Sequence, residues 1–519
     1  MTPEMHPQRW GDPAEAEALP ASTRALVDAY LGTAERPAVE EVELPAPRMG
    51  EDLLALLRGV VGDDAVLTDD ATRRLRTRGK STPDLLRARS GDLTDAPDAV
   101  VRPGSHEDVV GVLAWAVEHH VAVVPFGGGT SVTGGLAATG DGYAGVVSLD
   151  LVRLDRLLSV DEVSMTAVLQ PGMRGPAAEA ALAGHGLTLG HFPQSFEFAS
   201  IGGFAATRSS GQSSAGFGRF DEMVVGLRVA TPIGELVLGS SPASAAGPDL
   251  RQVVLGSEGT LGVITEVNVR VRPAPAEKVY DAWSFPSFAE GAEAMRALSQ
   301  GGSLPTVLRL SDEAETMVNL TSQSDIGGEG GGGCVMIVGH EGASVAARRA
   351  EVSQALESAG GTGLGEERGR AWAEGRFHAP YLRDSLLDVG VLVETLETAT
   401  FWSSRDRVYQ AVRQALEGSL GNALVLCHIS HVYETGCSLY FTVAAREGDD
   451  PLQQWLAAKA AASDALIGAG ATITHHHAVG TDHKPWLARE IGPVGVAMLR
   501  GLKDAVDPTG VLNPGVLVP

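Results

Sequence analysis

The stretch Pro125-Phe126-Gly127-Gly128-Gly129-Thr130-Ser131-Val132-Thr133-Gly134-Gly135 decides the fold of this chain. It begins at the end of Val121 to Pro125, an apolar run that predicts a strand. Glycines lack a Cβ, so successive backbone N–H groups can point at one anion, and the Thr and Ser hydroxyls add donors. The stretch therefore indicates a loop that binds a diphosphate. The alternative is a tight turn that binds nothing.

The residues before this loop predict a strand and a helix. Ala99-Val100-Val101 is a short β-branched run. Ser105 offers a helix N-cap, with Asp108 three residues later, and apolar residues then recur at helical spacing until His119. A strand–helix–strand unit thus leads into the glycine loop. Another segment, Gly79-Lys80-Ser81, resembles the end of a P-loop, but Arg74 stands where that motif needs its first glycine.

Two later segments rich in small residues extend the pattern. The first is Gln194-Ser195-Phe196-Glu197-Phe198-Ala199-Ser200, which leads to Thr207-Arg208-Ser209-Ser210, and the second is Gly256-Ser257-Glu258-Gly259-Thr260-Leu261-Gly262. In order and spacing, these segments and the glycine loop resemble the FAD-binding domain of the vanillyl-alcohol-oxidase and p-cresol-methylhydroxylase family. The resemblance implies that all three hold FAD, with a cap over the flavin ring formed by the second half of the chain.

Histidines gather near the C-terminus. Six of the 14 lie in one short window: His428, His431, His475, His476, His477 and His483. Imidazoles serve as acid–base catalysts or metal ligands, and a solvated loop without function is a third interpretation. His428, His431 and Glu434 offer some metal ligands, but we expect no metal, because no supporting pattern is readable.

The sequence around these histidines resembles the alkylglycerone-phosphate (alkyl-dihydroxyacetonephosphate) synthases within the same flavoprotein family. The matching segments are Cys427–Phe441, His475–Gly480, Lys484–Leu487, Val506–Pro514, Tyr381–Asp384 and Glu394–Trp402, and the likeness begins near Arg9. It implies a redox-neutral transferase of ether-lipid synthesis. Through a flavin adduct, a fatty alcohol would replace the acyl group of acyl-dihydroxyacetone phosphate.

The same resemblance implies the site residues. Tyr440 and the run His475, His476 and His477 match the catalytic residues, and Arg383 matches the arginine that binds substrate. From the residues alone, Tyr440 can equally be a packed strand aromatic, and Arg383 can be in an ion pair with Asp384 or Glu394.

Two alternatives stay open. The FAD-linked D-2-hydroxyacid dehydrogenases carry a glutamate where this chain has His476, and a glycine–aspartate–glycine metal segment where it has Ser430 to Gly436. Both differences favour the synthases, although His428 replaces their usual arginine and Gln194 their usual aspartate. The other alternative is a flavin-fold protein without turnover.

Composition narrows the class of protein. The 519 residues carry a net charge of −25, which argues against a nucleic-acid surface. With three cysteines, Cys334, Cys427 and Cys437, neither a disulfide framework nor a four-cysteine zinc site is available. No targeting segment or membrane-spanning run is visible, so we expect a cytoplasmic enzyme, with peripheral membrane contact left open. A homodimer is implied by the resemblance only.

These patterns predict an α+β fold: an FAD-binding domain of the p-cresol-methylhydroxylase (PCMH) type, an α/β cap, and helical segments at both ends. The expected bounds are 1–94 for the N-terminal helical segment, 95–275 for the FAD-binding domain, 276–445 for the cap and 446–519 for the C-terminal segment that returns to the flavin. The glycine-rich run Ile326 to Gly333 predicts a flexible loop. Helical spacing of apolar residues predicts helices over Gly342 to Ala359 and Pro451 to Ile467.

The first testable prediction concerns how FAD is held. No cysteine or histidine lies in a recognisable flavin-attachment pattern, so acid precipitation of the purified yellow protein should release all the FAD into the supernatant. Flavin absorbance that stays with the precipitate would contradict non-covalent binding.

Overall fold

The first half of the chain is built on two sheets. The computed structural model describes residues 4–16, 18–40, 42–137, 139–322 and 333–519, so all of the glycine-rich run except Gly333 lies outside the described residues. A four-stranded sheet has the order β1 (Val66–Leu67), β2 (Ala99–Val101), β4 (Val146–Asp150), β3 (Ala122–Phe126). Strands β2, β4 and β3 are parallel, and β1 is antiparallel to β2.

The predicted strand–helix–strand unit is confirmed. Helix α5 (His106–His119) begins after Ser105, whose hydroxyl accepts a hydrogen bond from the Asp108 N–H at 3.0 Å. It ends at His120 in the left-handed conformation (φ 52°). Strand β3 then runs directly into the glycine loop.

The second sheet is antiparallel and carries short helices. Its order is β5 (Leu157–Asp161), β6 (Thr166–Leu169), β10 (Val263–Arg270), β8 (Val224–Thr231), β9 (Gly234–Leu238). The helices of this part are α6 (Gly175–Ala183), α7 (Ile201–Thr207), α8 (Ser214–Phe217), α9 (Phe220–Met223) and α10 (Leu250–Val254). Strands β7 (Leu187–Thr188) and β11 (Arg272–Pro273) form a separate antiparallel pair.

The N-terminal helices do not form a separate core. They are α1 (Ala21–Tyr30), α2 (Glu51–Val61), α3 (Asp70–Leu75) and α4 (Thr82–Arg89). Leu54 and Leu57 of α2 share the core of the first sheet with Val109 and Leu113 of α5. Leu31, just after α1, packs instead against Val391 of the cap.

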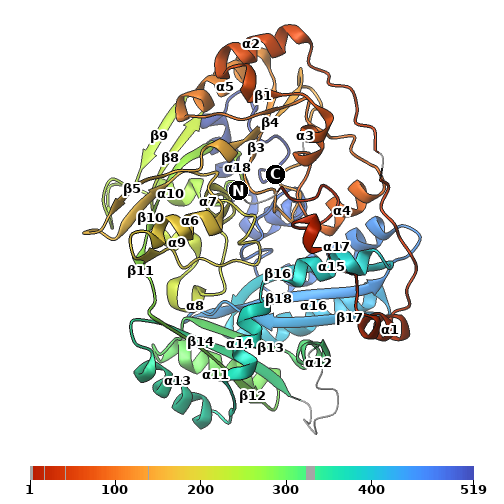
Figure 1. Ribbon diagram of the computed structural model, residues 1–519, viewed down its shortest axis with the longest axis vertical. Helices are drawn as coiled ribbons and strands as arrows, with labels where there is room; N and C mark the ends of the chain where they lie inside the picture. The colour runs from red at the N-terminus through yellow and green to blue at the C-terminus, as the bar shows by residue number, and fades with distance from the viewer. Residues whose placement is uncertain (1–3, 17, 41, 138, 323–332) are drawn as a thin grey trace.

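The cap is a seven-stranded antiparallel sheet, at the lower end of the view in Figure 1. Its order is β15 (Thr362–Gly365), β12 (Glu277–Phe285), β14 (Cys334–Gly342), β13 (Val307–Ser311), β17 (Ala423–Ile429), β18 (Gly436–Arg446), β16 (Val391–Phe401). Its helices are α11 (Phe288–Gln300), α12 (Glu313–Ser322), α13 (Ala346–Ser358), α14 (Glu366–Gly375), α15 (Ala379–Leu387) and α16 (Arg405–Leu420).

The last segment of the chain contacts both halves. Helix α17 (Pro451–Gly468) buries Trp455 and Leu466 in the cap core. Helix α18 (Lys484–Val506) is interrupted at Gly492 (φ 71°). Beyond α18 the chain forms a parallel bridge from Leu512 to Val123 of β3, so its end lies beside the strand that leads into the glycine loop.

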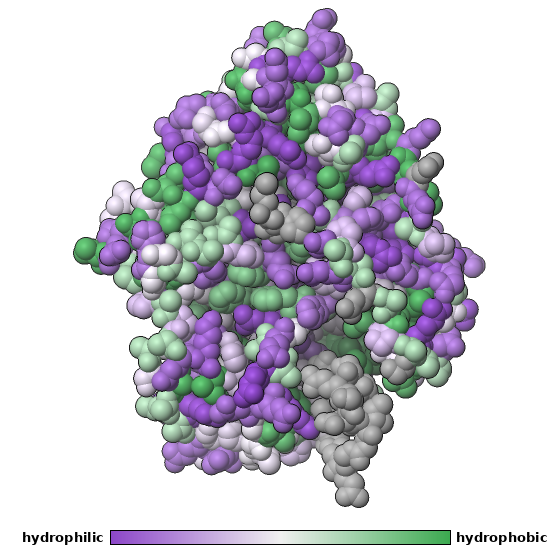
Figure 2. All heavy atoms as spheres, viewed as in Figure 1, coloured by the Kyte–Doolittle hydropathy of each residue, from purple (hydrophilic) through white to green (hydrophobic). Residues whose placement is uncertain are grey.

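The outer surface is largely hydrophilic on the face viewed in Figure 2. Hydrophilic residues predominate on the face shown in Figure 2, with hydrophobic residues scattered among them. Within the described ranges, none of the helices has both the length and the apolar character needed to cross a bilayer.

The second prediction concerns the cap core. Trp455 is fully buried, so Trp455→Ala should cost about 3–5 kcal/mol of stability and lower the midpoint of thermal unfolding by several degrees. The control is Met498→Ala in α18, whose side chain is 66% exposed and should leave the midpoint almost unchanged. Equal midpoints for the two variants would contradict this account of the core.

Candidate active site

The three segments expected to hold FAD pack against one another. A Cβ added to Gly128 would overlap the Phe198 carbonyl, and one added to Gly259 would lie 2.8 Å from Pro125. The Glu258 N–H donates to the Ala206 carbonyl at 3.0 Å, near the end of α7. Glycine is therefore needed at 128 and 259 so that these backbones can approach closely.

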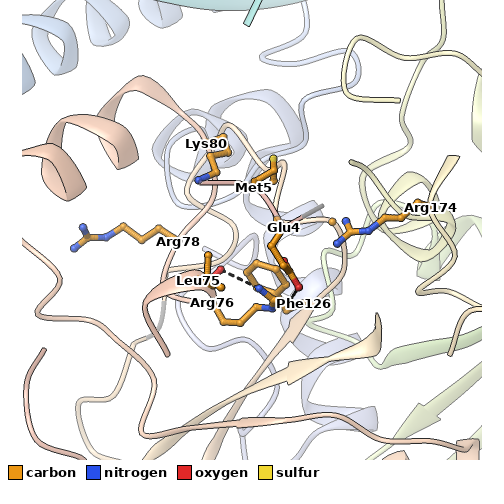
Figure 3. A pocket seen from close by; sticks show the side chains of 10 residues that line it. Glu4, Met5, Leu75, Arg76, Arg78, Lys80, Phe126 and Arg174 are labelled. Atoms are coloured by element: carbon orange, nitrogen blue, oxygen red, sulfur yellow. Dashed lines mark hydrogen bonds and ion pairs between the residues drawn. The ribbon is translucent and has the colours of Figure 1, made fainter. Parts of the chain in front are cut away.

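A small, positively charged cavity lies beside the glycine loop. Its volume is about 20 Å³, and it is lined by Glu4, Met5, Leu75, Arg76, Arg78, Lys80, Phe126, Gly128, Gly129 and Arg174. Figure 3 shows Glu4 between the guanidinium groups of Arg76 and Arg174. Arg76 contacts Glu4 at 2.7 Å, whereas in the described chain no carboxylate lies within ion-pair distance of Arg174.

Lys80 belongs to this cavity although its P-loop-like motif is incomplete. Its backbone N–H donates to the Ser131 carbonyl at 2.7 Å, so the Gly79-Lys80-Ser81 segment packs directly on the glycine loop. Burial lowers the pKa of the Lys80 ammonium to about 8, because the charged form is poorly solvated there. An arriving anion would stabilise that charge.

The donors in this region fit the diphosphate of FAD. The cavity combines glycine backbone with the cations Arg76, Lys80 and Arg174. Outside the lining of this cavity, the buried Nε2 of Gln194 has no hydrogen-bond partner within the described ranges, so the second expected FAD segment also has a donor available to a ligand. A diphosphate in the cavity would displace the Glu4 carboxylate, whose side chain is 46% exposed.

Two buried carboxylates hold the histidine run in the loop Thr474–Gly480. Glu397 of β16 accepts hydrogen bonds from the backbone N–H groups of His475, His476 and His477 at 2.8, 3.2 and 3.0 Å. Glu258 accepts hydrogen bonds from the N–H groups of Val479 and Gly480. The cap and the FAD-type half thus each supply one anchor for the loop.

Tyr440 lies at the centre of a group of aromatic rings. It pairs with Glu397 across strands β16 and β18. Its ring stacks on His428 at 4.7 Å between centroids and lies 6.0 Å from His476 and 5.5 Å from His477. The structure therefore brings the tyrosine and the histidine run together, as the resemblance predicts.

Burial determines the charge of these groups. It raises the pKa of Tyr440 to about 12 and lowers the pKa of His477 to about 3. It also holds the pKa of His431 and that of His475 well below the usual histidine value. Burial disfavours the charged form of Glu397 too, but the adjacent His476 outweighs it and holds the pKa of this carboxyl well below its usual range. The site thus contains a protonated phenol, neutral imidazoles at His431, His475 and His477, and one buried carboxylate.

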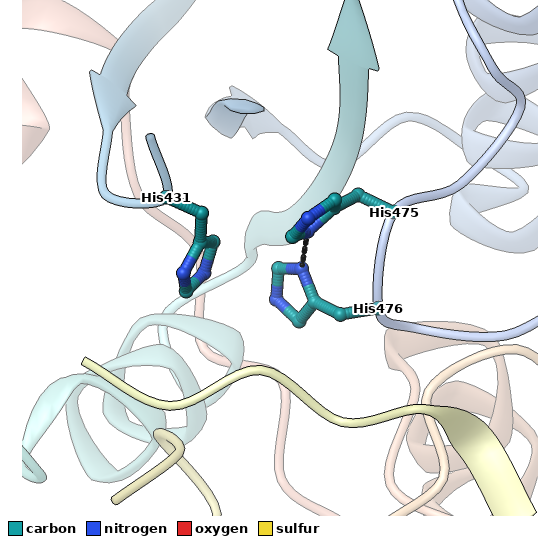
Figure 4. A group of neighbouring side chains, drawn as sticks. All are labelled: His431, His475 and His476. Atoms are coloured by element: carbon teal, nitrogen blue, oxygen red, sulfur yellow. Dashed lines mark hydrogen bonds between the residues drawn. The ribbon is translucent and has the colours of Figure 1, made fainter. Parts of the chain in front are cut away.

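The ligand set considered from the sequence is not assembled. Glu434 is exposed, and the Nδ1 of His428 lies 3.0 Å from Glu315. A different trio, His431, His475 and His476, has ring nitrogens within 4.8 Å of one another (Figure 4). These nitrogens serve as hydrogen-bond partners within the protein: His475 Nδ1 lies 2.9 Å from His476 Nδ1, and His431 Nδ1 lies 2.6 Å from the Ser214 hydroxyl.

Arg383 lies apart from the rings. Its guanidinium donates to the Lys80 carbonyl at 2.7 Å and pairs with Asp384 at 3.2 Å, which is one of the two ion pairs considered from the sequence. Its second terminal nitrogen is buried and, among the described residues, has no partner. Arg383 thus adds an unused donor next to the Lys80 segment.

Sequence reasoning missed several groups that shape the site. Glu397 lies in a segment that matched the synthases, but no role was inferred for it. Arg219 donates to the His475 carbonyl at 3.0 Å, and the Tyr433 hydroxyl lies 2.6 Å from His475 Nε2. Arg174, in the cation-lined cavity, carried no motif signal.

Comparison with known proteins identifies the family. Residues 97–239 match the model described as "FAD binding domain", and residues 274–517 match "FAD linked oxidases, C-terminal domain". The alkyldihydroxyacetonephosphate synthase of Dictyostelium discoideum is 33% identical over 93% of this chain and 83% of its own length. The chain belongs to the alkyldihydroxyacetonephosphate synthase family.

Other relatives agree with this. The synthase of Trypanosoma brucei brucei is 33% identical over 92% of this chain and 82% of its own length. A solved alkyldihydroxyacetonephosphate synthase structure superposes with a TM-score of 0.86 at 29% identity, covering 99% of both chains. The resemblance, the FAD cofactor and the α+β fold predicted from the sequence are confirmed.

More distant relatives are less similar to this chain in sequence. A p-cresol methylhydroxylase structure superposes with a TM-score of 0.67 at 17% identity, over 93% of this chain and 98% of that one, which shows the fold alone. The mitochondrial D-lactate dehydrogenase [cytochrome] of Arabidopsis thaliana is 26% identical over 90% of this chain and 80% of its own length. The dehydrogenase alternative therefore has the weaker support.

The third prediction tests the glycine loop. Gly128→Ala should displace Phe198 and Ala199 and sharply lower the FAD content of the purified protein, because the new Cβ would overlap that backbone. The measurement is the ratio of flavin to protein absorbance. The matched control, Gly59→Ala in α2, meets no atom within 4 Å and should keep full flavin content. Unchanged flavin in Gly128→Ala would refute the packing argument.

Proposed function

We propose that this protein exchanges the acyl group of acyl-dihydroxyacetone phosphate for a fatty alcohol, releasing a fatty acid and forming the ether bond. The observation that supports this best is that Tyr440 lies beside the rings of His476 and His477, which belong to a loop anchored from both halves of the molecule. Family membership supplies the reaction class.

Tyr440 and its neighbours supply the proton transfers. With a pKa of about 12 the phenol stays protonated near neutral pH, so it can donate a hydrogen bond to the carboxylate that leaves. Beside it, the neutral imidazole of His477 can accept a proton, including one bound to carbon in the substrate. FAD, when bound, supplies a reversible electron sink, so the exchange needs no net oxidation.

The phosphate of the substrate needs a cation. We assign this role to Arg383, because one terminal nitrogen of its guanidinium is buried and unpartnered among the described residues. The segments 125–131, 194–200, 207–210 and 256–262 are assigned to FAD, together with Arg76, Lys80 and Arg174 of the cation-lined cavity.

The long-chain substrates bear on where the protein works. We place it in the cytoplasm in peripheral contact with membrane lipid. Val494 and Met498, one turn apart on α18, are 72% and 66% exposed and offer an apolar contact. The resemblance alone supports a homodimer.

The fourth prediction tests the chemistry. Tyr440→Phe removes one hydroxyl and little volume, so FAD content should survive while ether-bond formation falls by about 10² or more. The assay is turnover of acyl-dihydroxyacetone phosphate with a fatty alcohol. Wild-type protein should show no useful reduction of its flavin by D-lactate or D-2-hydroxyglutarate with a dye acceptor, and fast reduction would favour the dehydrogenase alternative. Full ether-bond activity in Tyr440→Phe would remove the phenol from the mechanism.

A further inference from the structure

The three consecutive histidines have different surroundings. Both ring nitrogens of His475 are engaged, Nε2 by the Tyr433 hydroxyl at 2.6 Å and Nδ1 by His476 Nδ1 at 2.9 Å. Among the described residues, the Nε2 atoms of His476 and His477 have no hydrogen-bond partner. Two of the three imidazoles therefore keep a nitrogen free to exchange a proton.

The same two rings flank Tyr440. His476 lies nearly parallel to the phenol, with an interplanar angle of 22°, and His477 meets it edge-on at 89°. In the described chain, no ring contact joins Tyr440 to His475. His475 instead packs on His431, Tyr433 and His476.

Glu397 contacts all three histidines and is the cross-strand partner of Tyr440. It is 1% exposed, and its carboxylate holds the backbone N–H groups of all three histidines. Its oxygens also lie 3.4 Å from His476 Nδ1 and 4.0 Å from His477 Nδ1. Because Glu397 pairs with Tyr440 across β16 and β18, one rigid sheet positions both the phenol and the loop.

We propose that Glu397 is the positioning residue of this site, that His476 and His477 exchange protons with Tyr440, and that His475 acts only through His476. The inference rests on the proposed function for its chemistry. It assigns proton exchange to two of the three histidines. It also adds a positioning carboxylate for which the sequence resemblance gave no role.

A carboxylate suits this task better than an amide. Glu397 carries two acceptor oxygens and a negative charge, so it can hold the backbone N–H groups and also stabilise a positive charge on a neighbouring imidazole. In a buried site that stabilisation is stronger than in water. A glutamine retains one acceptor oxygen, but its NH₂ group would face backbone N–H groups.

The chain offers a matched control on the same strand. Glu394 is also buried in β16, at 3% exposure, and its carboxylate accepts hydrogen bonds from the Thr82 and Thr395 N–H groups. Three positions separate it from Glu397, so the two side chains point to opposite faces of the strand. Glu394→Gln removes a buried charge without touching the histidine loop.

The fifth prediction compares Glu397→Gln with Glu394→Gln in the FAD-loaded protein. Glu397→Gln should lower kcat by about 10²-fold with a nearly unchanged KM and unchanged flavin content, because substrate binding survives while proton transfer is misaligned. Hydrogen exchange at His475, His476 and His477 should speed up by about tenfold or more, since their acceptor is impaired. Glu394→Gln should leave this exchange unchanged, because the Glu394 carboxylate accepts hydrogen bonds from Thr82 and Thr395 and not from the histidine loop.

A second series keeps the inference testable if Glu397→Gln fails to fold. His476→Asn and His477→Asn should each lower kcat far more than His475→Asn. A loss in His475→Asn equal to theirs would overturn the division of roles, and so would wild-type kcat or loop exchange in Glu397→Gln. Wild-type protein without any ether-bond turnover would reject the proposed function instead, while the exchange experiment would still decide whether Glu397 holds the loop.

Discussion

The rest of the site depends on one interaction: the Glu397 carboxylate accepts hydrogen bonds from three consecutive backbone N–H groups. A loop without secondary structure leaves such groups unpaired, and burying them unpaired is costly. Each hydrogen bond to a charged acceptor stabilises by about 1.5–3 kcal/mol. The carboxylate gains as well, because these donors replace the hydrogen bonds to water that burial removes. The loop and the carboxylate therefore satisfy each other's hydrogen bonds, so both can be buried.

Glu258, the second carboxylate that holds the loop, differs from Glu397 in the direction of its pKa shift. Burial raises the pKa of Glu258 to about 7, whereas His476 keeps the pKa of Glu397 low despite burial. Glu258 also adopts the left-handed conformation (φ 53°), and its carbonyl accepts a hydrogen bond from Asn513 at 2.7 Å. The expected FAD segment, the histidine loop and the end of the chain thus converge on one residue. Displacing any of them would disturb the others.

Local sequence patterns predicted the elements that depend only on residues close together in the chain. The cap by Ser105, strand β3 and its glycine loop, and helix α17 follow from hydroxyl placement and apolar spacing within one short window. One helix was placed wrongly at its start: Gly342 to Ala359 was expected, but β14 continues to Gly342 in register with Glu277, and α13 begins at Ala346. Pairing with a distant strand decided that boundary, and no local pattern contains it.

The domain bounds at 94/95 and 445/446 stay predictions for a related reason. Helix α2 packs into the first sheet and α17 into the cap, each across an expected boundary. Composition and turn signals mark where a chain changes character. They do not show which core a helix joins.

The site was predictable in composition but not in arrangement. The resemblance named Tyr440 and the histidines, yet nothing in their spacing shows that Ser210 and Ser214 of the other half contact His431, at 3.0 and 2.6 Å. Glu397 gives no signal either, because an acidic residue in a strand is ordinarily taken as solvent-facing. Only the pairing of β16 with β18 places it opposite Tyr440. Gly128 shows the same limit: sequence explains the glycine by an approaching diphosphate, whereas its missing Cβ faces Phe198. Glycine at this position is therefore required by packing within the protein, before any cofactor is considered.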